Sequence, residues 1–115
     1  MSIMTEPAQN TIWKHQKHNL SRGKLHIYRV ICVTKPLALS KDRQFLVVAS
    51  SAADGADHKV FQQYNGYVAV TFENHRGVNG NHVIYENIYN QRRWMRTLDD
   101  FIGNRHGKPR FEQLA

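Results

Sequence analysis

The sequence predicts a small α+β protein: a five-stranded antiparallel sheet or small barrel, SH3-like or OB-like, closed by one C-terminal amphipathic helix. Three observations lead to this prediction. Segments rich in β-branched and aromatic residues recur along the chain. Tight-turn signals separate the later segments, and the clearest is Asn65-Gly66. An apolar stripe with helical spacing, residues 94–102, follows the last segment. A chain of 115 residues has room for one compact domain.

The first two predicted strands are apolar on both faces, which is typical of central, buried strands. They cover residues 24–34 (KLHIYRVICVT) and 44–50 (QFLVVAS). Residues 1–23, before them, are polar and basic and show no period, so we expect a loosely ordered N-terminal arm. Trp13 interrupts the arm; it either anchors this segment to the domain or contacts a partner.

Three more strands are predicted to form an antiparallel meander at residues 58–64, 67–74 and 82–89. The Asn-Gly pair at 65–66 favours a type I′ turn, because both central positions of that turn need positive φ. A second turn-rich cluster, RGVNGN at 76–81, precedes the last strand.

The last predicted element is a helix. Its apolar face follows the i, i+1, i+4, i+7, i+8 pattern of Trp94, Met95, Leu98, Phe101 and Ile102. Thr97 followed by Asp100 resembles a capping box, so the alternative is a short helix that begins there. We place the globular domain at residues 24–105 and a basic C-terminal tail at residues 106–115.

The formal net charge of +7 is concentrated near the N-terminus, since no acidic residue occurs between Glu6 and Asp42. Clustered positive charge selects polyanions, although an acidic protein partner or simple solubility would also account for it. The predicted nucleic-acid contacts are Lys14, Lys17, Arg22, Lys24, Arg29 and Lys35, with Arg92, Arg93 and Arg96 as an extension.

Aromatic residues add a second indication of nucleic-acid binding. Tyr64 and Tyr67 flank the Asn-Gly turn and are predicted to face away from the core. Exposed rings beside cations stack unpaired bases, and we include both tyrosines in the predicted interface. The alternative is that tyrosines are simply good strand formers at half-exposed positions.

Two histidines suggest the only enzymatic reading. His75 and His82 flank the second turn, and such a pair could cleave RNA by general acid–base catalysis without a metal. Polar loop histidines without any catalytic role are the commoner case. His15 and His18 share helical spacing, but no Cys, Asp or Glu lies near them, so the sequence predicts no metal site and no cofactor.

Cys32 is the only cysteine and lies in an apolar segment, as a small core residue does. No secretory signal and no membrane-spanning stretch are visible, and we expect a cytoplasmic protein. Phosphate-loop, dinucleotide, serine-hydrolase and zinc-protease motifs do not occur.

The leading hypothesis is therefore a small basic accessory protein that binds DNA or RNA mainly through phosphate contacts, in the manner of accessory proteins of mobile genetic elements. The first alternative is an inhibitor or assembly factor that docks on an acidic protein. The second is a metal-independent ribonuclease or toxin. The face running from Trp94 to Ile102 could also serve as a homodimer surface.

Overall fold

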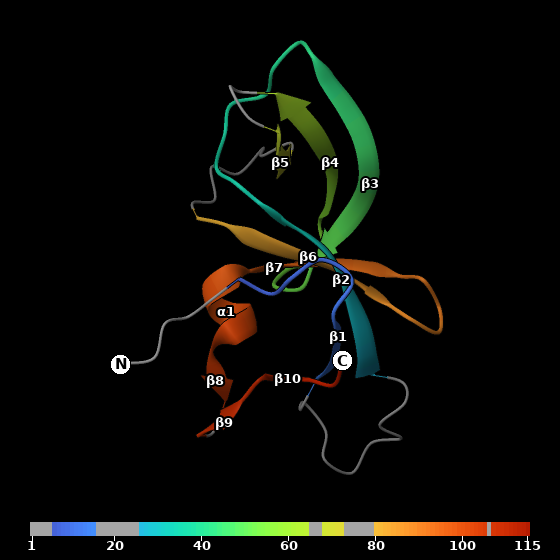
Figure 1. Ribbon diagram of the computed structural model, residues 1–115, viewed down its shortest axis with the longest axis vertical. Coiled ribbons are helices and arrows are strands. Elements are labelled where there is room, and N and C mark those ends of the chain that lie inside the picture. The colour runs from blue at the N-terminus through green and yellow to red at the C-terminus, as the bar shows by residue number, and fades with distance from the viewer. Residues whose placement is uncertain (1–5, 16–25, 65–67, 73–79, 106) are drawn as a thin grey trace.

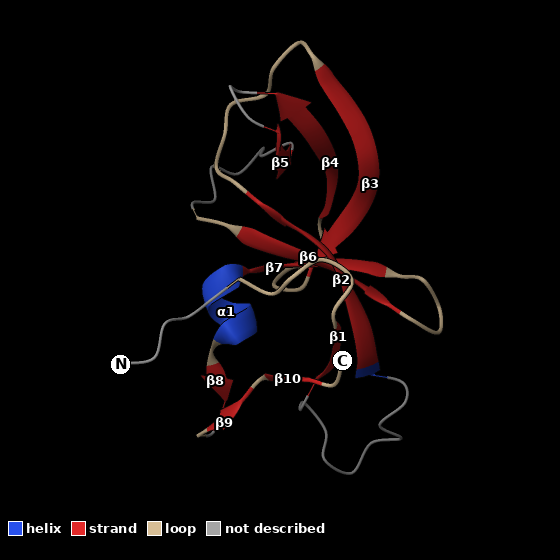
Figure 2. Cartoon of the chain, in the orientation of Figure 1, coloured by secondary structure: helices blue, strands red, loops and turns tan. Residues whose placement is uncertain are grey.

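The computed structural model describes residues 6–15, 26–64, 68–72, 80–105 and 107–115. These residues form a small, mostly β fold: an eight-stranded sheet curled into a half-barrel, a two-stranded hairpin and one short helix (Figures 1 and 2). The strands of the large sheet are β1 (Ile12–His15), β2 (Ile27–Thr34), β3 (Arg43–Ser51), β4 (Asp57–Tyr64), β5 (Val68–Phe72), β6 (His82–Asn87), β7 (Arg93–Thr97) and β10 (Phe111–Gln113). The hairpin is β8 (Asn104–Arg105) with β9 (Lys108–Pro109), and the helix is α1 (Leu98–Ile102).

The strand order in the large sheet is β10-β1-β2-β6-β7-β3-β4-β5. All five predicted strands are present, because residues 24–34, 44–50, 58–64, 67–74 and 82–89 overlap β2 to β6 in order. The predicted number of strands and their wholly antiparallel pairing are wrong. Three further strands join the sheet, and β3 pairs parallel with β7.

The helix predicted over residues 94–102 is wrong in its first half. β7 fills the gap between β6 and β3, so Trp94 and Met95 pack in different cores on opposite faces of the sheet. Pairing with two neighbours gives this backbone its hydrogen bonds, and tertiary pairing therefore overrides the helical period. The helix begins after Thr97, whose hydroxyl accepts a hydrogen bond from the Asp100 amide at 3.2 Å, as the capping alternative predicted.

The predicted arm and the predicted tail each contribute one strand to the large sheet. β1 pairs with β2 on one side and with β10 on the other. Trp13 anchors β1: its indole N–H donates to Thr11 Oγ1 at 2.8 Å, and its ring contacts Phe101 edge-on with centroids 5.3 Å apart. Residues 12–15 and 111–113 thus differ from the loose segments expected from their polarity, because each carries aromatic or apolar side chains that the core accepts.

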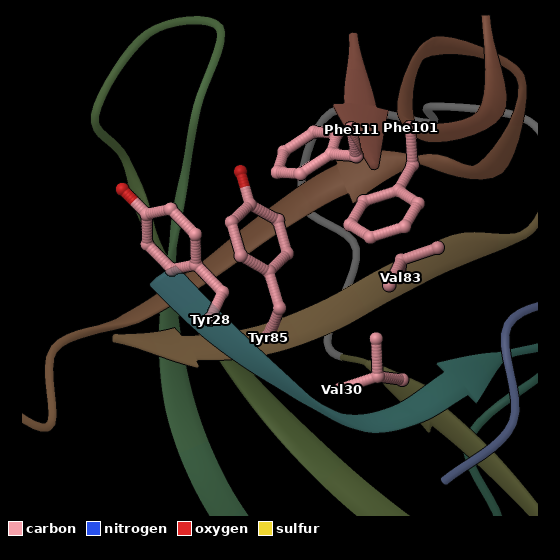
Figure 3. Close-up of a cluster of buried hydrophobic side chains, with 6 residues drawn as sticks. All are labelled: Tyr28, Val30, Val83, Tyr85, Phe101 and Phe111. Carbon is pink, nitrogen blue, oxygen red and sulfur yellow. The ribbon is translucent and has the colours of Figure 1, made fainter. Parts of the chain in front are cut away.

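The first core lies on the face of β2 and β6 that α1 and β10 cover. Figure 3 shows its rings and branched side chains converging from four elements. Phe101 of α1 stacks on Phe111 of β10 with centroids 4.1 Å apart, and Tyr85 contacts both rings. The buried members are Tyr28, Val30, Val83, Tyr85, Phe101 and Phe111.

The second core lies on the opposite face, where β3, β4 and β5 curl over the central strands. Its buried members are Ala49, Val60, Phe72, Ile84 and Met95. Every residue of β6 is buried because this strand contributes side chains to both cores.

Candidate nucleic-acid interface

Three of the cations predicted to bind nucleic acid fall outside the described residues; they are Lys17, Arg22 and Lys24. Lys14 lies half-buried on β1, in register with Glu112 of β10. The ammonium of Lys35 donates to Glu6 Oε2 at 2.6 Å, so its charge is neutralised at the surface. An exposed pair of this kind contributes little to stability, and it lowers the positive potential that Lys35 can offer.

Arg29 and Arg93 share one acidic partner, Glu86. They lie on the two strands that flank β6, each in register with Glu86 between them. Arg29 Nη2 lies 2.6 Å from Glu86 Oε2, and Arg93 Nε lies 3.3 Å from Glu86 Oε1. The Glu86 side chain is only 9% exposed, whereas those of Arg29 and Arg93 are 46% and 41% exposed. A buried carboxylate thus holds two guanidinium groups toward solvent, and the group keeps one net positive charge.

Arg92 lies in the turn before β7 and stacks on Trp94, which is on the opposite face of the sheet from the Glu86 group because side chains alternate along a strand. Its Cζ lies 4.0 Å from the centroid of the Trp94 ring, which is a cation–π contact. Arg92 itself is exposed, while Trp94 is half-buried against the first core. A guanidinium stacked on an indole keeps one planar face toward solvent.

The turn between β6 and β7 projects from the side of the sheet (Figure 1). The Ile88 amide donates to the Ile27 carbonyl at 3.1 Å, which places this turn against the beginning of β2. Lys14 lies opposite Ile27 on the neighbouring strand. Arg29 and Arg93 therefore meet at Glu86 at the end of the central strands that carries this turn, with Arg92 in the turn and Lys14 on β1 opposite Ile27.

Arg96 points into the protein instead. Its Nε donates to the Tyr85 hydroxyl at 3.2 Å, and its Nη1 donates to Asp100, which also pairs with Arg110 at 3.3 Å. Burial alone would lower the pKa of Arg96, but Tyr85 and Asp100 outweigh it and hold that pKa above its ordinary value. Its side chain is only 15% exposed, so we leave Arg96 out of the candidate interface.

The two histidines of the ribonuclease hypothesis are not brought together among the described residues, because His75 lies outside them. His82 instead shares the lining of a cavity of about 180 Å³ with His58. Its Nδ1 lies 3.2 Å from the Gly80 carbonyl, which can only accept, so Nδ1 carries the proton. Burial lowers the pKa of His82, the Gly80 carbonyl opposes this, and the charge of His58 adds to the lowering. At 3% exposure, this is a buried neutral imidazole.

The rings predicted to stack bases are not placed by the structure. Tyr64 ends β4 and Tyr67 lies outside the described residues. Tyr89, in the turn between β6 and β7, is an exposed aromatic residue, with 50% of its surface accessible. The sequence pattern places Tyr89 on a strand, but it lies in the turn after β6. His58 was also not identified from the sequence as a partner of His82. The sequence signal was that His58 and Val60 alternate along the strand, which assigns both side chains to the core face.

The predicted dimer surface is part of the core. Met95 and Phe101 are 4% and 1% exposed, so the face from Trp94 to Ile102 packs within this chain. Within the described ranges, no three His, Cys, Asp or Glu side chains gather as metal ligands would. No helix in this part of the chain has the length and apolar character needed to cross a bilayer.

Comparison of the chain with protein-family models, with curated proteins and with solved structures finds no match.

Proposed function

We propose that this protein binds nucleic acid, mainly through phosphate contacts, at the end of the central strands where Arg29 and Arg93 share Glu86 and Arg92 lies in the adjoining turn. The observation that supports this most strongly is the arrangement of Arg29 and Arg93 around Glu86. Lys14 extends the surface, and Lys17, Arg22 and Lys24 remain part of the proposal from the sequence.

Arg29 and Arg93 each have N–H donors that do not contact Glu86. A guanidinium carries five N–H donors, and the bonds to Glu86 engage Nη2 of Arg29 and Nε of Arg93. The remaining N–H groups suit the fork-like contacts that arginine makes with phosphate oxygens. Because Glu86 already restrains both side chains, less rotamer entropy is lost when an anion binds.

The proposal includes finer points that follow from the sequence. The curled sheet would present its strands as SH3-like and OB-like barrels do, and the protein would act in the cytoplasm as an accessory component of a nucleoprotein complex, such as one of a mobile genetic element. An acidic protein surface is the alternative partner for the same arginines. Ribonuclease activity is less favoured, since His82 is buried and its ring packs 4.9 Å from Phe72.

The test replaces the arginine group as a whole. Arg29→Gln, Glu86→Gln and Arg93→Gln together remove both guanidinium groups without leaving a buried unpaired carboxylate. Binding of fluorescently labelled DNA and RNA is measured by anisotropy at several salt concentrations. We expect weaker binding to all sequences and a salt dependence that is flatter by roughly one unit of slope for each phosphate that the protein no longer neutralises.

Lys59→Gln is the matched control, because it changes the net charge by the same single unit at an exposed position on β4. We expect it to leave the affinity close to that of the parent. Unchanged binding by the triple variant would remove these arginines from the interface. Binding to polyglutamate with no binding to nucleic acid would favour the acidic protein partner instead.

A further inference from the structure

The turn between β6 and β7 is held rigidly by its own side chains. Asn87 Oδ1 accepts hydrogen bonds from the amides of Tyr89 at 2.8 Å and Asn90 at 3.2 Å. Asn90 Oδ1 in turn accepts from the Arg92 amide at 2.9 Å. The backbone closes the turn at both ends: the Asn87 amide donates to Arg92 O, and the Gln91 amide donates to Asn87 O, both at 2.9 Å. Gln91 has a φ of 58°, in the left-handed region that such a reversal needs.

This rigid turn displays two planar groups. Tyr89 is 50% exposed, and Arg92 is an exposed residue whose guanidinium lies on the Trp94 ring. Exposing apolar surface costs stability, and neither of the two cores includes Tyr89. An exposed aromatic ring on a turn whose backbone is held in place, with a stacked guanidinium three residues further along, offers surfaces for a planar ligand at little cost in backbone ordering.

We propose that the substrate of this interface is single-stranded nucleic acid, whose unpaired bases stack on Tyr89 and on the open face of Arg92. This inference rests on the proposed function and specifies its substrate. The phosphates of the same strand would contact Arg29 and Arg93, which lie on strands adjoining the turn.

The geometry favours a single strand over a duplex. In a duplex the base faces are covered by their neighbours, so stacking side chains reach them only where the strand is unpaired. The charge near the turn favours nucleic acid over an apolar protein surface, because Arg29 and Arg93 share a single carboxylate, Glu86, and Arg92 adds a cation within the turn itself.

The test separates bases from phosphates. Three labelled ligands of equal length are compared at one salt concentration: single-stranded oligothymidine, the same strand with abasic sites throughout, and a mixed-sequence DNA duplex. Tyr89→Ala should weaken binding to oligothymidine by about tenfold, the effect of removing one base–ring stack. It should leave the affinity for the abasic strand and for the duplex unchanged.

Two variants serve as controls. Tyr89→Phe keeps the ring and should bind oligothymidine like the parent. Phe45→Ala removes another exposed ring, 53% accessible on β3, and should have no effect on any ligand. The thermal melts of both Tyr89 variants should coincide with that of the parent to within a few degrees, since the Tyr89 side chain is largely in solvent.

The outcomes distinguish the two proposals. Binding to all three ligands with no loss in Tyr89→Ala would overturn the single-strand inference and leave nucleic-acid binding intact. Absence of binding to any of them would overturn both. A further outcome is that Tyr89→Ala loses affinity for the abasic strand by the same factor as for oligothymidine. That result would also contradict base stacking, because the Tyr89 ring would then contribute to binding in the absence of bases.

Discussion

At the scale of single residues, Cys32 behaves as its apolar neighbours predicted. It packs against the second core, and burial raises the pKa of its thiol to about 12. Glu86 could not be interpreted in the same way from sequence. Its partner Arg29 is 57 positions away, and only strand pairing brings them together. Local patterns report which residues are apolar, whereas ion pairs across strands depend on register.

The Cys32 thiol should be nearly unreactive in the folded protein. Because its pKa lies about three units above the ordinary 9.0, the reactive thiolate at pH 8 should be depleted by roughly 10³-fold. We expect iodoacetamide to modify the native protein at least about 10²-fold more slowly than the protein unfolded in guanidinium. Mass spectrometry over a time course measures both rates. Equal rates in the two states would show that the thiol is exposed or ionised.

At the scale of elements, local sequence identified strands β2 to β6 and the start of α1, but not β1, β7 or β10. The three missed strands are short, and their side chains are mixed in polarity. β7 is the clearest case, since Trp94 and Met95 fit a helical stripe as well as a strand whose two faces meet two cores. This segment forms a strand because it pairs with both β6 and β3. The local sequence contains no information about those two pairings.

Phe111 tests whether the last residues belong to the core. Its ring is 4% exposed and stacks on Phe101 and on His15, with centroids 4.1 and 4.5 Å away. Phe111→Ala should lower the free energy of unfolding by about 3–5 kcal/mol, as measured in urea. Leu114→Ala, at a position 47% exposed, should change it by less than about 0.5 kcal/mol. A loss below about 1 kcal/mol at Phe111 would mean that β10 is not docked in solution.

At the scale of the whole molecule, His82 and His58 join the two parts of the curled sheet. They come from β6 and β4, and both rings contact Phe72 of β5. Asp54, Arg96 and Asp100 line the same cavity, so its charges come from separate parts of the chain. Sequence alone suggested His82 as a catalytic partner of His75. In the structure, His82 lines this cavity and packs against Phe72 of the second core.

Stability should therefore fall in mild acid. Burial lowers the folded pKa of His82 below its ordinary 6.5, so the unfolded chain binds more protons between the two values. The contribution of His82 is complete above about pH 6.5 and is lost as the pH falls through the folded pKa. In urea titrations from about pH 8 to about pH 5, His82→Asn should show a smaller decline than the parent. An identical decline in both proteins would show that His82 does not titrate differently on folding.

The pairing of β1 with β10 has a consequence for biosynthesis. Trp13 and Gln113 are register partners although about 100 residues separate them. At a translation rate of about 5–20 residues per second, one edge of β1 waits roughly 5–20 s for its partner strand to be made. During that interval the first core is incomplete, because its rings Tyr85, Phe101 and Phe111 are all made late in the chain. The nascent chain thus carries an open strand edge and an unfilled aromatic core, the kind of surface that chaperones shield.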